Sequence, residues 1–315
     1  MATRFGVVDV GTNSVRVLVA EADSRDLRDV ERDLLITRLG EGVDRERRLG
    51  DDPMRRTVAV IAEYVQRCRA AGATKIRVIA TSAVRDAANR EEFLTAVKDA
   101  CGIRPDVLAG EEEARLGFAG ATASIAAPEP YLVLDIGGGS TELVRGAAGA
   151  ERFVSMDIGA VRLTERHIHS DPPTTADLAL ARADAEEHLA RAIRVVGDEP
   201  VGTLVGLAGT ITSAAAIHLG LEGYDRDAIH HARVPRAAVD GIRRRLSALT
   251  SQDRRRLPAM PRGREDVIVA GLVILESVMD RFGCGEVLVS ESDILDGAAL
   301  ALARGLISPE SPATR

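Results

Sequence analysis

FGVVDVGTNSVRVL (residues 5–18) and YLVLDIGGGSTELV (residues 131–144) are two copies of one pattern, separated by 126 residues. Each copy has an apolar run, an aspartate, a short glycine-containing loop, a serine and a second apolar run. Asp9 in the first copy corresponds to Asp135 in the second. A pattern repeated about one domain length apart predicts two related lobes, each built on a strand, a loop and a second strand.

Short β-branched segments alternate with helical patterns along the chain, which is typical of an α/β fold. A helix capped by Asp52 is expected, because Pro53 suits a first helical position. Residues 265–282 are apolar on nearly every face, which predicts a helix buried between layers. Strands are expected at residues 5–10, 15–20, 76–80, 131–136, 142–145, 203–207 and 286–290.

The two copies also set the expected domain boundaries. The first lobe is predicted to span residues 1–125 and the second lobe residues 126–307. The last residues, 308–315, are rich in Pro and Ser and are predicted to form a disordered tail. The sequence does not settle whether the end of the second range crosses back to the first lobe.

The composition narrows the possible functions of this chain of 315 residues. Its 41 Lys and Arg against 48 Asp and Glu give a formal net charge of −7, which excludes a generally basic nucleic-acid binder. With five Phe, three Tyr and no Trp, stacking on single-stranded bases is not expected either. A local cationic pocket for a small polyanion is still compatible with this charge.

The sequence gives no sign of a disulfide framework, a zinc site or a membrane segment. Cys68, Cys101 and Cys284 are widely spaced and form no CxxC motif. The longest apolar run, residues 267–275, is nine residues and too short to span a bilayer. We therefore expect a cytoplasmic protein that binds neither membrane nor nucleic acid.

The loop between the two strands of each copy has the chemistry of a phosphate site. Its glycines let backbone N–H groups approach an anion without a Cβ in the way, and its serine adds a donor. An aspartate at the strand end suits a divalent cation, which prefers oxygen ligands. One such loop alone is more often a plain glycine turn, but two matching copies favour phosphate binding. Neither loop has the Gly-Lys-Ser/Thr of a Walker A motif, and the second opens into a strand, unlike a dinucleotide fingerprint.

Four motifs in register resemble the exopolyphosphatase and guanosine pentaphosphate phosphohydrolase (Ppx/GppA) family. They are DVGTNS (9–14), ATSAVRDAAN (80–89), GEEEARL (110–116) and DIGGGSTELV (135–144). The resemblance covers the two-lobe catalytic core of that family. It implies two ribonuclease H-like lobes of the acetate and sugar kinase/Hsp70/actin superfamily around a cleft.

The resemblance also implies roles for individual residues. Glu113 matches the catalytic base, which takes a proton from the water that attacks the terminal phosphorus, and Arg85 matches a phosphate-contacting arginine. Asp135 and Glu142 match acidic residues that hold Mg²⁺ (or Mn²⁺), and Asp9 is a third candidate ligand from the repeat. The expected substrate-binding residues are Gly11, Thr12, Asn13, Ser14, Ser82, Gly137, Gly138, Gly139 and Ser140, with Gly209 and Thr210 as an open candidate.

Several of these residues have simpler interpretations. Glu111, Glu112 and Glu113 suit the first turn of any helix, and only the register of the motif favours Glu113 over Glu112 as the base. Arg85 followed by Asp86 also suits a surface ion pair.

Other features stay open or favour a structural role. Gly209 and Thr210 at a helix start offer N–H groups to a phosphate, but the pair equally suits close packing of strand on helix. The arginine clusters at 243–245, 254–256, 262 and 264 are more typical of solvated helix faces than of a guide for a polyanion. The histidines lack the spacing of metal ligands.

The function predicted from the resemblance is Mg²⁺-dependent hydrolysis of the terminal phosphoanhydride of inorganic polyphosphate, with release of orthophosphate. The alternatives are a guanosine pentaphosphate 5′-phosphohydrolase, a sensor of these ligands with little turnover, and a nucleotide-dependent phosphotransferase of the same superfamily. The sequence does not separate polyphosphate from guanosine pentaphosphate. Family resemblance also implies a homodimer, which nothing else in the chain requires.

Overall fold

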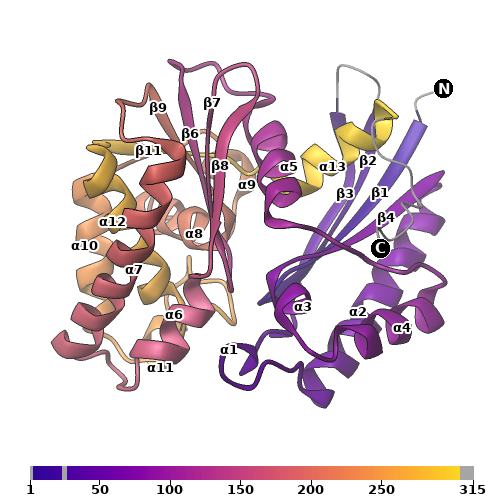
Figure 1. Cartoon of the computed structure of the whole chain (residues 1–315), viewed down its shortest axis with the longest axis horizontal. Coiled ribbons are helices and arrows are strands. Elements are labelled where there is room, and N and C mark those ends of the chain that lie inside the picture. Colours follow the sequence, from indigo (N-terminus) through magenta and orange to yellow (C-terminus); the bar gives the residue numbers. More distant parts are fainter. Residues whose placement is uncertain (1–2, 23–26, 306–315) are drawn as a thin grey trace. The chain divides into compact units, whose positions relative to one another are not determined.

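The chain forms two compact units (Figure 1). The computed structural model describes residues 3–22 and 27–305. Unit 1 contains the described residues up to Gly120 together with those from Ile294 onward, and unit 2 is Ala121–Asp293. Within the described residues, no helix combines the length and apolar character needed to cross a bilayer.

Unit 1 is built on a five-stranded mixed sheet with strand order β3-β2-β1-β4-β5. The central strand β1 pairs antiparallel with β2 and parallel with β4. The strands are β1 (Thr3–Val10), β2 (Ser14–Ala22), β3 (Leu27–Ile36), β4 (Lys75–Ala80) and β5 (Asp106–Val107).

Both faces of the sheet in unit 1 are covered by helices, because successive side chains of a strand point to opposite faces. Val8 and Val10 of β1 join the core formed with α2 and α4, whereas Phe5 and Val7 join the core formed with α13. The helices are α1 (Val43–Glu46), α2 (Asp51–Ala70), α3 (Ser82–Asp86), α4 (Arg90–Cys101), α5 (Gly110–Thr122) and α13 (Ile294–Ala303).

Unit 2 repeats this topology. Its sheet has the order β10-β11-β9-β6-β7-β8, in which β6 pairs antiparallel with β7 and parallel with β9. The strands are β6 (Tyr131–Ile136), β7 (Thr141–Gly146), β8 (Ala150–Met156), β9 (Thr203–Leu207), β10 (Arg233–Pro235) and β11 (Glu286–Val289). The two ribonuclease H-like lobes predicted from the repeat and the family resemblance are confirmed, and β10 is an added edge strand.

The helices of unit 2 are α6 (Ala160–His167), α7 (Thr175–Val196), α8 (Ala208–His218), α9 (Arg226–Ile229), α10 (Arg236–Ser247), α11 (Ser251–Arg254) and α12 (Ile268–Phe282). Four of them, namely α6, α7, α8 and α10, pack against α12. Helix α12 is buried along most of its length as predicted, although it begins at Ile268 rather than Glu265.

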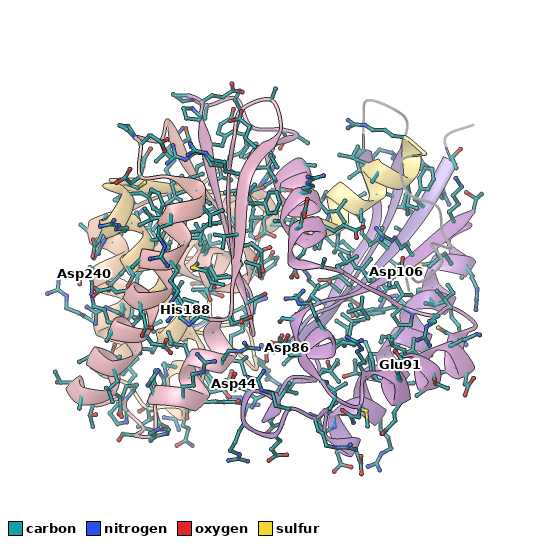
Figure 2. All side chains as sticks on the ribbon, viewed as in Figure 1. Asp44, Asp86, Glu91, Asp106, His188 and Asp240 are labelled. Carbon is teal, nitrogen blue, oxygen red and sulfur yellow. The ribbon has the colours of Figure 1, made fainter. Side chains whose placement is uncertain are left out.

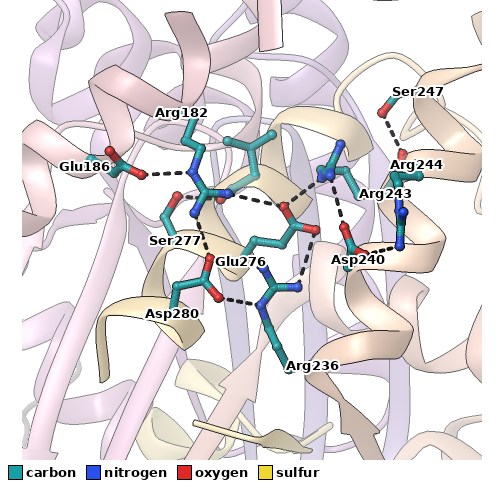
Figure 3. A network of polar contacts seen from close by, with 11 residues as sticks. Arg182, Glu186, Arg236, Asp240, Arg243, Arg244, Ser247, Glu276, Ser277 and Asp280 are labelled. Carbon is teal, nitrogen blue, oxygen red and sulfur yellow. Dashed lines mark hydrogen bonds and ion pairs between the residues drawn. The ribbon is translucent and has the colours of Figure 1, made fainter. Parts of the chain in front are cut away.

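A buried carboxylate links three of these helices (Figure 3). Glu276 on α12 has 1% of its side chain exposed and accepts a hydrogen bond from Arg243 Nε on α10 over 2.7 Å. Arg182 on α7 and Arg236 on α10 lie 3.7 and 3.6 Å from the same carboxylate. Three guanidinium groups offset the cost of burying this charge, so the network holds α7 and α10 on α12.

The start of one helix and the place of one segment differ from the sequence-based expectations. The helix expected to be capped by Asp52 begins at Asp51 with Gly50 as its N-cap, because acidic residues and a proline are both tolerated in the first turn. The segment 294–303, included in the predicted second lobe, is α13, whose apolar side chains pack with Phe5, Val7 and Leu18 in unit 1. The predicted tail, 308–315, lies outside the described residues.

Strands β3 and β8 were not among the expected strands. β3 has charged residues at half of its positions, namely Arg28, Asp29, Glu31, Arg32 and Asp33, and it lies at the edge of its sheet. Charges protect an exposed edge from pairing with another chain, and here they hide the alternating pattern.

Candidate active site

The loop between β1 and β2 is held from behind by the segment after β3. Gly11 N–H donates to Ser14 O over 2.9 Å, which closes the loop. Thr37 and Arg38 N–H donate to Asn13 O, and Gly40 N–H donates to Thr12 O over 2.8 Å. A Cβ on Gly40 would lie 2.2 Å from Thr12 Cγ2, so only glycine allows this close approach.

The loop between β6 and β7 is closed by the corresponding hydrogen bond. Gly137 N–H donates to Ser140 O over 3.0 Å, and the carbonyls of Gly137 and Gly138 accept from Ala160 and Val161 N–H at the start of α6, both over 2.9 Å. These two carbonyls are therefore tied back to the helix, as those of Thr12 and Asn13 are tied back to the segment after β3.

The backbone N–H groups in the middle of each loop form a site suited to an anion. Those of Thr12 and Asn13, and those of Gly138 and Gly139, have no hydrogen-bond acceptor in the part of the chain that the structure describes. Successive N–H groups in such a turn carry partial positive charge toward one side and bind phosphate-like oxygens. Each repeat thus has a backbone arrangement compatible with the predicted phosphate cradle, and phosphate binding itself stays a prediction.

Ser82 and Thr12 are brought together in unit 1. Their hydroxyl oxygens lie 2.9 Å apart, one donating to the other, and both residues are buried. Ser82 begins α3, so this contact joins the first loop to the helix that carries Arg85.

Two carboxylates face each other across neighbouring strands in unit 2. Asp135 on β6 is directly opposite Glu142 on β7, and Glu142 is 3% exposed. Ser155 on β8 donates a hydrogen bond to Glu142 Oε1 over 2.7 Å. Like charges directly opposite in a sheet repel, and a cation between them removes the repulsion.

This donor set fits Mg²⁺ or Mn²⁺. Mg²⁺ in phosphate-transferring sites uses one or two carboxylates and completes its shell with water and substrate oxygens. Among the described residues, no group of three or more His, Cys, Asp or Glu is arranged to hold a metal ion, so a closed protein cage is not present there. Asp135 and Glu142 are the residues that would hold the cation.

Asp9 has a different partner from Asp135. Directly opposite it on β2 is Arg16, which donates to Asp9 Oδ2 from Nε over 3.0 Å and from Nη2 over 2.6 Å. The guanidinium supplies the positive charge that a cation would supply, which argues against the predicted role of Asp9 as a metal ligand.

Glu113 and Arg85, the two predicted catalytic residues, are in contact. Arg85 Nη1 donates to Glu113 Oε2 over 2.9 Å and to Leu108 O over 3.0 Å. The Glu113 side chain is 13% exposed and that of Arg85 is 23% exposed. A carboxylate anchored by a guanidinium in a half-buried position has the properties needed to orient a water molecule.

The neighbouring glutamates point elsewhere, because each helical residue is rotated about 100° from the one before it. Glu112 accepts a hydrogen bond from Arg77 Nη2 over 2.9 Å, and the buried Arg77 also donates to Asp106 (labelled in Figure 2). Glu111 pairs with Arg115 one turn later. Only Glu113 of the three contacts Arg85, which supports the register chosen from the motif.

Gly209 and Thr210 at the start of α8 are held by packing. A Cβ on Gly209 would lie 2.0 Å from Arg264 Cζ, and one on Gly271 of α12 would lie 2.2 Å from Thr210 Oγ1. Thr210 is 5% exposed, so its side chain is used in the contact with α12. Close packing of α8 on α12 accounts for Thr210. At Gly209, the absence of a side chain lets the guanidinium of Arg264 lie at the start of α8.

The arginine clusters are mostly paired with acids. In the first cluster, Arg243 pairs with Glu276 and Arg244 pairs with Asp240. In the second cluster, Arg254 pairs with Asp171, Arg255 with Glu265 and Arg256 with Asp253. The interpretation of these clusters as structural charges is therefore favoured over a guide for a polyanion.

Sequence reasoning missed Arg16 and Ser155, and it treated Arg264 only as part of a cluster. Arg16 had a usable signal, because it aligns with Glu142 when the two copies are superposed. Ser155 had none, since its strand carries no motif.

Comparisons with known proteins identify the family of the chain. A model of the Ppx/GppA phosphatase family matches residues 18–302. Exopolyphosphatase 2 of Mycobacterium tuberculosis is 41% identical, over 96% of this chain and 99% of that protein. A bifunctional 3-dehydroquinate synthase/phosphatase of Fusobacterium nucleatum is 31% identical, over 93% of this chain and 46% of that protein.

Solved structures are similar over nearly the whole chain. The crystal structure of an exopolyphosphatase-like protein superposes with a TM-score of 0.92 at 35% identity, covering 97% of this chain and 100% of that one. The Ppx/GppA family member of Aquifex aeolicus superposes with a TM-score of 0.83 at 29% identity, covering 98% and 100%.

Proposed function

The chain belongs to the Ppx/GppA phosphatase family, and on this basis we propose that it is an exopolyphosphatase that depends on Mg²⁺ or Mn²⁺. It is an enzyme that hydrolyses phosphoanhydride bonds, and its proposed substrate is inorganic polyphosphate. The observation that carries the proposal is the pair of matched loops, each with two adjacent N–H groups that have no acceptor among the described residues. Each cradle of this kind suits one phosphate group, and polyphosphate is a chain of such groups.

In the proposed reaction, Glu113 takes a proton from a water molecule as its oxygen bonds to the terminal phosphorus. The bond from that phosphorus to the bridging oxygen breaks, and the electron pair leaves with the shortened chain. One water is consumed, one orthophosphate is released, and the proton on Glu113 returns to solvent. Arg85 fixes the Glu113 carboxylate through its 2.9 Å hydrogen bond and adds positive charge beside the reacting group.

The loop N–H groups hold phosphate oxygens without any rearrangement, because the backbone behind them is already tied back. A divalent cation held by Asp135 and Glu142 would neutralise charge on the phosphate oxygens. We also propose, from family resemblance, that the protein acts in the cytoplasm as a homodimer, which light scattering on the purified protein would test.

The experiment that tests the proposal measures orthophosphate release by the purified protein with Mg²⁺. Short-chain polyphosphate, long-chain polyphosphate, guanosine pentaphosphate and ATP are compared side by side, with Glu113→Gln as the inactive control. We expect release from polyphosphate, little from ATP, and loss of release in the control.

Each other outcome points to a named alternative. Preferred release from guanosine pentaphosphate would identify a pentaphosphate phosphohydrolase. Turnover of ATP alone would favour a nucleotide-dependent enzyme of the same fold. Tight binding of one polyanion without release would identify a sensor and overturn the catalytic proposal.

A further inference from the structure

Ser155 on β8 is the cross-strand neighbour of Glu142 in unit 2. The strand register pairs the two residues directly, and Ser155 Oγ donates to Glu142 Oε1 over 2.7 Å. A hydroxyl that donates to a carboxylate at this distance forms a charge-assisted bond, stronger than one between neutral groups. Glu142 is buried, so bulk water does not compete for the same oxygen.

Glu142 lies between a repelling and an attracting neighbour. β7 is the strand between β6 and β8, so Asp135 flanks Glu142 on one side and Ser155 flanks it on the other. A glutamate side chain has three rotatable bonds, and repulsion from Asp135 does not select one orientation of it. The bond from Ser155 selects one orientation of the carboxylate.

The first repeat provides a comparison within the same chain. There the residue across from Arg16 on the outer strand is Leu34, which has no hydroxyl to offer. Arg16 is already held by its two hydrogen bonds to Asp9. A hydroxyl on the outer strand therefore accompanies the copy in which the inner pair consists of two carboxylates.

We propose that Ser155 is a positioning residue that orients Glu142 toward the divalent cation, an inference that rests on the proposed function. Glu142 would hold the cation through its carboxylate while Ser155 keeps its hydrogen bond to Oε1. Removing the hydrogen-bond partner of a metal ligand typically weakens cation binding or activity by about 10–100-fold. The bond from Ser155 to Glu142 is of this type.

Ser155→Thr and Ser155→Val form the matched pair for the test, because they have nearly the same shape and differ in one hydroxyl. Mn²⁺ binding to the full chain is measured by electron paramagnetic resonance without substrate, and thermal unfolding verifies that each variant folds. Ser155→Thr is expected to bind Mn²⁺ like the original chain, and Ser155→Val about tenfold or more weakly. If Ser155→Val does not fold, Ser155→Ala takes its place.

Ser277→Ala is the control for loss of a buried hydroxyl. Ser277 Oγ donates to Val273 O over 2.9 Å, within α12, so this variant should bind Mn²⁺ normally. Raising Mg²⁺ should restore phosphate release by Ser155→Val with an unchanged KM for polyphosphate, a response that general structural damage would not give.

Equal Mn²⁺ affinity in Ser155→Thr and Ser155→Val would overturn the inference. Glu142→Gln separates this failure from a failure of the proposed function. If Glu142→Gln loses Mn²⁺ while the matched pair is equal, the cation site stands and only the role of Ser155 is wrong. If Glu142→Gln binds Mn²⁺ as tightly as the original chain, the proposed cation site is wrong and the inference fails with it.

Discussion

Glu142 on β7 occupies, in the second repeat, the position that Arg16 on β2 occupies in the first. Each lies directly across from the aspartate of its own copy, Asp135 or Asp9. One aspartate is therefore neutralised by a guanidinium, and the other stands beside a second carboxylate. The two copies share a backbone but differ in the sign of one charge, so we assign the cation to the second copy alone.

This assignment predicts different effects of the same substitution in the two repeats. Asp135→Asn should weaken Mn²⁺ binding by more than about tenfold, because it removes a charged ligand. Asp9→Asn should leave Mn²⁺ binding unchanged, since that carboxylate already has Arg16 as a partner. Titration of Mn²⁺ into both purified variants checks the prediction, and equal losses would contradict it.

Glu113→Gln and Glu112→Gln should separate the base from its neighbour. Glu113→Gln is expected to lower kcat by about 10²–10⁴-fold, the usual contribution of a general base, with folding unaffected. Glu112→Gln removes only an ion pair with Arg77 and should stay within a few-fold of the original rate. The rate of phosphate release at saturating polyphosphate gives kcat for both variants. The reverse order would show that the register is wrong by one residue.

Gly159→Ala should damage the second loop. A Cβ at Gly159 would lie 2.5 Å from the backbone of Gly138, so the loop has to move. Because Gly138 supplies one of the N–H groups proposed to hold phosphate, we expect a clear rise in KM for polyphosphate. Gly149→Ala, where no atom lies within 4 Å of the added methyl, is the control and should behave as the original chain.

Glu276→Gln should lower stability without affecting the reaction. The substitution keeps the shape but removes the charge that balances three arginines. Breaking a fully buried ion pair typically costs about 3–5 kcal/mol. The arginines are partly exposed and have other partners, so we expect a loss of about 2–3 kcal/mol in the free energy of unfolding. Urea unfolding of Glu276→Gln, with Glu186→Gln on the surface as the control, measures it.

His188 (labelled in Figure 2) should make the protein less stable in mild acid. Burial lowers its pKa from 6.5, and the nearby Asp184 carboxylate only partly opposes this effect. The unfolded chain therefore binds a proton at a higher pH than the native chain, so stability is complete above pH 6.5 and falls as the pH decreases below it.

Replacing His188 with Gln should make this decrease shallower. Unfolding free energies at pH 7.5 and pH 5.5 test the prediction, with His218→Gln at the exposed end of α8 as the control. Equal decreases in the original chain and in His188→Gln would rule out the proposed role of this histidine.

The repeat could be recognised from the sequence because its information is local. An aspartate, a glycine loop and a serine within six residues specify both the turn and the donors that line it, and the strands on either side of the loop follow from the two copies. Cross-strand partners need one further step, since the register around a short loop fixes which residues are opposite one another. Counting outward from the first loop would have placed Arg16 beside Asp9.

Other contacts depend on residues that carry no pattern of their own. Ser155 is unremarkable in sequence and gains its role only because β8 pairs with β7 in one register. The contact of Arg264 with Gly209 joins segments that are far apart in the chain, and nothing local to either predicts it. Packing between segments that are distant in the sequence determines both of these contacts.

The return of α13 to unit 1 sets the order in which the protein can be completed during synthesis. The strands of unit 1 are made before unit 2, but Phe5, Val7 and Leu18 have α13 among their packing partners, and that helix is made only after unit 2. Unit 2 is continuous in sequence, so it can finish folding while the apolar face of unit 1 that packs against α13 is still uncovered. The core of unit 1 is thus completed only after unit 2 has been made, and until then the apolar face that α13 covers stays exposed in the nascent chain.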